Sequence, residues 1–169
     1  MRKFILGILP ALMLTAAPAA AEQIVAVNLD DAGTLATLIE TDTKVKTEGD
    51  GSVRITAAWP VTVPLHDASG LNLDNVKLVY KAQVRSKDLV GKAYLEMWVR
   101  VKGQAYFSRG TTSFIEGTNK KWQTIVTPFI LQPGQVADQV MLNIIVNGKG
   151  TVWVDDIVLE GDPLIPTPK

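Results

Sequence analysis

The chain has 169 residues, with 17 basic and 17 acidic side chains, one histidine and no cysteine. Nothing in this balance suggests a protein that binds nucleic acid or an anionic membrane surface. The lack of cysteine excludes disulfides and thiolate chemistry, and the single histidine excludes a site built from several histidines.

The first 21 residues have the pattern of a secretory signal peptide. Arg2 and Lys3 precede an apolar run over residues 4–14, and small residues end at Ala21. That run is too short to cross a membrane comfortably, so an uncleaved anchor is the weaker alternative. We therefore expect a periplasmic or secreted bacterial protein, with no membrane attachment after cleavage. Its parts would be a signal peptide (1–21), one domain (22–160) and a proline-rich tail (161–169).

The body of the chain alternates apolar and polar residues, as β-strands do, between turns rich in Gly, Pro, Asn and Asp. Residues 34–40 have apolar residues at helical spacing but are also rich in threonine, so they are left open between helix and strand. Many short strands with almost no helix predict an all-β fold, a two-sheet jelly-roll β-sandwich. The predicted strands are residues 52–57, 61–66, 77–86, 93–103, 122–131, 138–148 and 148–159.

Aromatic, amide and charged side chains alternate with the predicted core residues on three of these strands. An indole or phenol ring accepts the C–H face of a sugar, and amides, guanidinium groups and carboxylates pair with its hydroxyls. If the three strands share a sheet, its outer face is a glycan-binding platform. The bland alternative is that Trp98 packs under a loop and its neighbours are ordinary surface residues. The candidate binding residues are Tyr94, Glu96, Trp98, Arg100, Gln83 and Asn143.

Further residues extend or limit this hypothesis. After the expected turn at Lys102 and Gly103, one of Tyr106 and Phe107 should face inward, and Tyr106 is the candidate to extend the platform. The common enzyme motifs are absent from the sequence. Glu96 would be the best carboxylate for a glycosidase, but no spaced acidic pair accompanies it, so hydrolysis is the weakest hypothesis.

Two adjacent carboxylates, Asp155 and Asp156, lie in the apolar run of residues 148–159. Side chains of neighbouring strand residues point to opposite faces, so one of the two carboxylates should lie among apolar side chains. Alternation alone does not say which one, and it argues against a shared role for both.

Several segments together resemble the galactose-binding-like β-sandwiches, in particular the carbohydrate-binding modules of families 4, 9 and 22. The resemblance spans residues 24–159 and is strongest in the segments TEGDGSVRIT, KKWQTIVTPFIL and NGKGTVWVDDIVL. It implies a non-catalytic domain with a sheet face that often holds glycans. It also implies a structural Ca²⁺ that joins the N-terminal segment to the last strand, with a ligand at Asp155.

Acidic loops could complete such a calcium site. Ca²⁺ prefers six to eight oxygen ligands, many of them carbonyls, and a buried carboxylate is costly unless it is paired or coordinated. The candidate ligands are Asp155, Asp50, Glu48 and Asp30. The alternative is that the strand aspartate accepts backbone N–H groups or pairs with Arg54.

The sequence therefore predicts an exported, non-catalytic module that binds a glycan or polysaccharide. A periplasmic domain that binds another protein, without sugar binding, is the alternative hypothesis.

Overall fold

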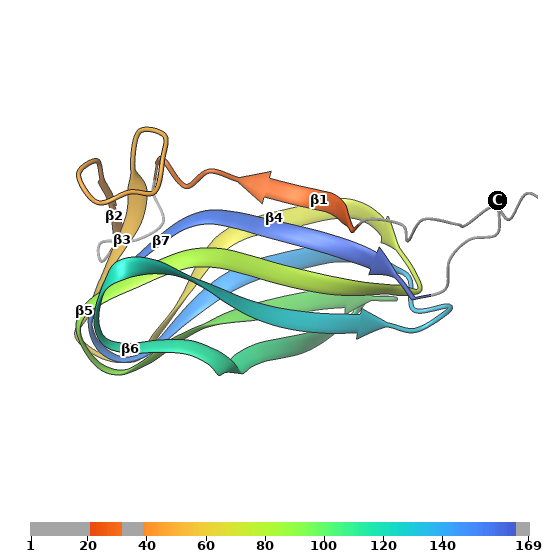
Figure 1. Cartoon of the computed structure of the whole chain (residues 1–169). Helices are drawn as coiled ribbons and strands as arrows, with labels where there is room; N and C mark the ends of the chain where they lie inside the picture. Colours follow the sequence, from red (N-terminus) through yellow and green to blue (C-terminus); the bar gives the residue numbers. More distant parts are fainter. Residues whose placement is uncertain (1–20, 32–38, 165–169) are drawn as a thin grey trace, which may run out of the picture.

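The computed structural model describes residues 21–31 and 39–164, and every regular element in these ranges is a β-strand. Three of the strands have 26 to 28 residues, far more than an ordinary strand. Figure 1 shows why: these long ribbons turn at one end of the molecule and run back in a second layer. The strands are β1 (Glu22–Val27), β2 (Ile39–Asp42), β3 (Ser52–Ala57), β4 (Val61–Leu73), β5 (Val76–Val101), β6 (Gln104–Leu131) and β7 (Ala137–Pro163).

Pairing divides the structure into two antiparallel sheets. β4 pairs with the first half of β7, whereas β1 and β3 pair with its second half. The halves of β5 and β6 are distributed in the same way. We call the first layer the β4 sheet; it contains β4 with residues 137–147 of β7, 92–101 of β5 and 104–116 of β6. We call the second the β3 sheet; it contains β1, β2 and β3 with residues 150–163 of β7, 76–87 of β5 and 119–131 of β6.

The bend that joins the two sheets depends on close contact between β5 and β7. Gly91 has φ +110°, and a Cβ atom there would lie 2.2 Å from the carbonyl oxygen of Asn147. A Cβ atom at Gly150, with φ +142°, would lie 2.6 Å from the Cα atom of Leu89. Only glycine fits these positions, because side chains disfavour such φ values and the opposing backbone leaves no room.

The hydrophobic core lies between the two sheets, as the alternation predicted. Leu78 and Tyr80 of the β3 sheet are fully buried, and Leu95, Met97 and Val99 of the β4 sheet are fully buried too. The prediction of an all-β, two-sheet sandwich is confirmed.

The structure also differs from the predicted elements. Residues 77–86 and 93–103 are two halves of one bent strand, so they lie in different sheets. Residues 104–121, for which no strand was predicted, belong to β6, and the expected turn at Lys102 and Gly103 connects it to β5. β7 continues to Pro163, three residues into the predicted tail.

Some predictions fall outside the described residues: the signal peptide (1–20), most of the segment left open between helix and strand (34–38) and the end of the tail (165–169). Ile39 and Glu40 of the open segment lie in β2. No helix capable of crossing a membrane occurs among residues 21–31 and 39–164.

Candidate functional site

Most of the predicted binding residues come together on the outer face of the β4 sheet. Tyr94, Glu96, Trp98 and Arg100 share this face of β5, and Asn143 lies directly opposite Glu96 on β7. Gln83 does not join them, because it precedes the bend and lies in the β3 sheet, where it donates a hydrogen bond to Thr124 (3.1 Å). We call this outer face the platform; it includes the side chains of Tyr94, Glu96, Trp98, Arg100, Phe107, Arg109, Gln139, Met141 and Asn143.

Two aromatic rings form the apolar part of the platform. Phe107 of β6 lies opposite Trp98, and their ring centroids are 5.2 Å apart with an interplanar angle of 42°. Phe107 is 52% exposed. Tyr106, the sequence-based candidate for this place, instead lies opposite Val99 on the other face of the strand. The prediction that one of the two rings is turned into the core is wrong, because Tyr106 is also 45% exposed. The register of the hairpin, which the turn at Lys102 and Gly103 sets, decides between the two rings.

The polar part of the platform is organised around Glu96, which is only 2% exposed. Its Oε1 accepts hydrogen bonds from Trp98 Nε1 (2.7 Å) and Asn143 Nδ2 (3.2 Å), and its Oε2 accepts one from Arg109 Nε (2.6 Å). Asn143 and Arg109 lie opposite Glu96 on the two neighbouring strands. Because both carboxylate oxygens are engaged, Glu96 is poorly placed to contact a ligand directly or to protonate a leaving group.

Arg109 joins the polar and aromatic parts of the platform. Besides its bond to Glu96, its guanidinium lies 4.8 Å from the centroid of the Phe107 ring. The hydrogen bond to Glu96 raises the pKa of Arg109 above its ordinary value. The guanidinium is therefore fixed between an anion and an aromatic face, with 44% of its side chain exposed to solvent.

Ion pairs and amides border the platform toward the Lys102–Gly103 hairpin. Arg100 forms two hydrogen bonds with the Asp138 carboxylate (2.8 and 3.1 Å), which lower the pKa of Asp138. Gln139 donates to both oxygens of Asp67 at 2.7 Å. The end nearer the bend has a different character: Lys92 Nζ lies 3.8 Å from the centroid of the Phe114 ring.

The acidic residues predicted to bind calcium are dispersed. Asp30 Oδ1 accepts the backbone N–H groups of Asp50 (2.6 Å) and Gly51 (2.8 Å), so it stabilises the loop between β2 and β3. Glu48 lines a surface depression together with Asn28 and Asp156. Within residues 21–31 and 39–164, no three His, Cys, Asp or Glu side chains are close enough to hold a metal ion together.

Asp155 and Asp156 do not point to opposite faces as the strand rule predicted. β7 bulges here, with Asp156 at φ +46°, and the register with β5 shifts. As a result, Oδ2 of Asp155 (2.8 Å) and Oδ2 of Asp156 (2.6 Å) both contact the Thr47 hydroxyl. Asp155 also accepts the N–H groups of Thr47 and Asp156, as in the alternative to calcium considered above, and burial raises its pKa.

A hydroxyl has one proton to donate, so it cannot satisfy both carboxylates. The second close oxygen pair requires either another proton or a cation. The raised pKa of Asp155 is in keeping with a shared proton, and a cation is the other arrangement that would satisfy the pair. Asp30, in contrast, is committed to the backbone of a neighbouring loop.

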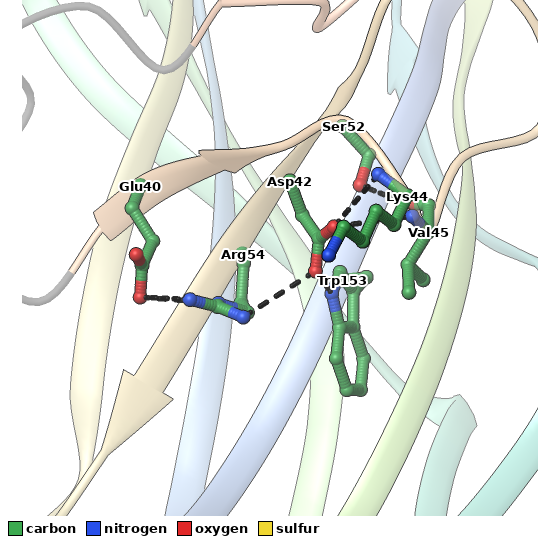
Figure 2. Close-up of polar contacts among 7 residues, drawn as sticks. All are labelled: Glu40, Asp42, Lys44, Val45, Ser52, Arg54 and Trp153. Atoms are coloured by element: carbon green, nitrogen blue, oxygen red, sulfur yellow. Dashed lines mark hydrogen bonds and ion pairs between the residues drawn. The ribbon is translucent and has the colours of Figure 1, made fainter.

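The same loop is also fastened to the β3 sheet at Asp42, as Figure 2 shows. Trp153 Nε1 donates to Asp42 Oδ2 (2.9 Å), and the backbone N–H groups of Lys44 and Val45 donate to Oδ1 (2.9 and 3.1 Å). Burial alone would raise the pKa of Asp42, but these bonds and the nearby Arg54 charge lower it overall. Trp153 is 7% exposed and serves this attachment rather than the platform.

Comparison with solved structures identifies the fold. The CBM22-1 xylan-binding domain of Paenibacillus barcinonensis Xyn10C is 14% identical, with a TM-score of 0.56 over 87% of this chain and 98% of that one. The CBM22-1–GH10 modules of Clostridium thermocellum xylanase Xyn10B, in complex with xylohexaose, are 11% identical, with a TM-score of 0.59 over 81% of this chain and 28% of that one. The Stig cyclase Fisc from Fischerella sp. TAU is 11% identical, with a TM-score of 0.51 over 88% and 81%.

The resemblance to carbohydrate-binding modules is thus confirmed for the fold. At these identities the likeness extends to the fold alone, and the cyclase shows that one fold hosts different functions. No protein-family model matches the sequence, and a search of curated proteins found no match.

Proposed function

We propose that this protein is an exported, non-catalytic module that binds a polysaccharide on the platform of the β4 sheet. The observation that carries the proposal is the pairing of an exposed ring, Phe107, with Trp98 beside a fixed set of hydrogen-bonding groups. A pyranose ring could lie on the aromatic pair while Arg109 and the nearby amides of Gln139 and Asn143 pair with its hydroxyls.

The environment of Glu96 supports the proposal that the module is non-catalytic. A glycosidase needs a carboxylic acid that reaches the glycosidic oxygen and a second carboxylate across the sugar. Glu96 is buried and its oxygens already accept three hydrogen bonds. A similar fold in a xylan-binding domain and in modules complexed with xylohexaose makes xylan a suitable first ligand to test.

The test is a titration of the protein with soluble xylan, mixed-linkage β-glucan and cell-wall glycans. Trp98→Ala should bind the recognised glycan about tenfold more weakly than the wild type, the effect expected of a central aromatic contact. Equal binding by the variant, or no binding of any glycan by the wild type, would contradict the proposal.

A second candidate function is docking of another periplasmic or secreted protein on the same face. It is favoured by the exposure of Phe107 (52%) and Met141 (36%), two apolar side chains that lie on the platform. A periplasmic partner that binds the wild type, does not bind Trp98→Ala and is not displaced by glycans would support docking over sugar binding.

The proposal includes a structural calcium ion only beside Asp155 and Asp156. There the ion would balance the two carboxylates that converge on Thr47. It would then hold the loop between β2 and β3 against β7, away from the platform.

A further inference from the structure

Charge pairing on the platform bears on the chemical class of the ligand, if the proposed glycan binding is correct. Two arginines lie at the centre and border of this face, yet each is matched by a carboxylate: Arg109 by Glu96 and Arg100 by Asp138. An acidic sugar would have to compete with these carboxylates for the guanidinium groups. The centre of the platform therefore presents hydrogen-bond donors without a free positive charge. Another cation of this face, Lys92, lies at the end nearer the bend, against the Phe114 ring.

Glu96 has the central part in this arrangement. It lies between Arg109 and Asn143 across three neighbouring strands, and it also accepts the indole N–H of Trp98. A buried carboxylate is costly unless its oxygens are hydrogen-bonded and its charge is matched. Here three donors from β5, β6 and β7 meet that requirement, and in return each donor is held in one orientation.

We propose that Glu96 is a positioning residue that orients Trp98, Asn143 and Arg109 and neutralises Arg109, so that the platform selects uncharged glycans over uronate-containing ones. The side chain itself makes no ligand contact. Its effect on binding passes through the indole, the amide and above all the guanidinium.

The decisive variant is Glu96→Gln. The amide oxygen can still accept from Trp98 and Asn143, but the amide group carries no charge and so leaves that of Arg109 unmatched. Affinity for soluble polygalacturonate should rise about tenfold, the factor that a charged hydrogen bond is typically worth, and this gain should disappear in high salt. Affinity for arabinoxylan or mixed-linkage β-glucan, whichever the wild type binds, should fall.

Two further variants separate this role from a general loss of structure. In Glu96→Gln with Arg109→Gln the unmatched charge is removed, so the gain for polygalacturonate should vanish. Glu160→Gln makes the same chemical change in the Lys81–Glu160 pair (2.6 Å) on the β3 sheet, and it should leave both affinities unchanged. Circular dichroism tests whether each variant is folded. If Glu96→Gln does not fold, the inference is tested by comparing the affinities of the wild type and of Arg109→Gln for polygalacturonate and for the uncharged glycans.

The outcomes distinguish this inference from the proposed function. A wild type that prefers polygalacturonate to the uncharged glycans, or a folded Glu96→Gln variant with the wild-type preference, overturns the role of Glu96 but leaves glycan binding intact. An Arg109→Gln variant that binds polygalacturonate more tightly than the wild type also overturns it. A wild type that binds none of these polymers overturns both.

Discussion

The bend at Gly91 separates the platform from the β3 sheet, and its tight fit gives a sharp prediction for Gly91→Ala. The new Cβ atom would lie 2.2 Å from the Asn147 carbonyl oxygen at a φ of +110°. Relief of such a clash typically costs about 1–3 kcal/mol, and a side chain in a sparsely populated φ region costs about 1–3 kcal/mol more. We expect the free energy of unfolding to fall by about 4 kcal/mol.

Gly103→Ala is the matched control. Gly103 also has a positive φ, +79°, but an added Cβ atom would have no neighbour within 4 Å. Only the cost of the unfavourable φ applies there, so the free energy of unfolding should fall by about 1–3 kcal/mol, toward the lower end because the added Cβ atom meets nothing. In a domain of this size the melting temperature should fall by roughly 10 °C for Gly91→Ala and roughly 4 °C for Gly103→Ala.

Thermal and urea unfolding followed by circular dichroism measure both variants. The prediction rests on the difference between them, because both share the unfavourable φ. Equal losses would show that β5 and β7 do not approach closely at the bend, and that the two halves of β5 are separated in some other way.

Two further predictions concern the loop between β2 and β3. The lowered pKa of Asp42 means that its contribution to stability is present above its ordinary pKa of 3.8 and is lost as the pH falls through the lower folded-state value. In Asp42→Asn the free energy of unfolding should therefore decrease less than in the wild type as the pH falls below about 4. Urea unfolding at a series of pH values measures this, and the same decrease in both proteins would contradict it. Addition of calcium should raise the melting temperature of the wild type more than that of Asp156→Asn, and a chelator should reverse the rise. An unchanged melting temperature of the wild type would contradict calcium binding.

The alternation of apolar residues predicted the fold well, because burial between two sheets enforces a period of two. Leu78 and Tyr80, like Leu95 and Met97, point inward as predicted. The alternation of apolar residues does not predict which strands share a sheet. Gln83 was placed on the platform because nothing in the pattern showed that β5 bends before residue 93.

Two further discrepancies have local causes. The bulge at Asp156 interrupts the period of two, so Asp155 and Asp156 meet at Thr47 instead of pointing apart. Phe107, and not Tyr106, lies on the platform because a two-residue turn sets the register of β6. The positive φ of Lys102 and Gly103 is typical of such a turn, and counting pairs outward from it would have placed Phe107 opposite Trp98.

Glu96 was identified from the sequence as a binding residue, but its role was not. In the sequence, an acidic residue between aromatic neighbours indicates a ligand contact or a catalytic group. Only the three strands together show that Arg109 and Asn143 lie on either side of it and occupy its oxygens.

The central claim, that a glycan binds on the outer face of the β4 sheet, is tested most directly by one pair of variants of β6. Phe107 (52% exposed) lies on the platform, whereas Ile130 (51% exposed) lies on the outer face of the β3 sheet. The two alanine variants should be similarly stable because both side chains are half-exposed. Titrated with the glycan that the wild type binds, Phe107→Ala should lose about tenfold in affinity and Ile130→Ala should lose none. Wild-type affinity in Phe107→Ala, or an equal loss in both variants, would contradict the claim.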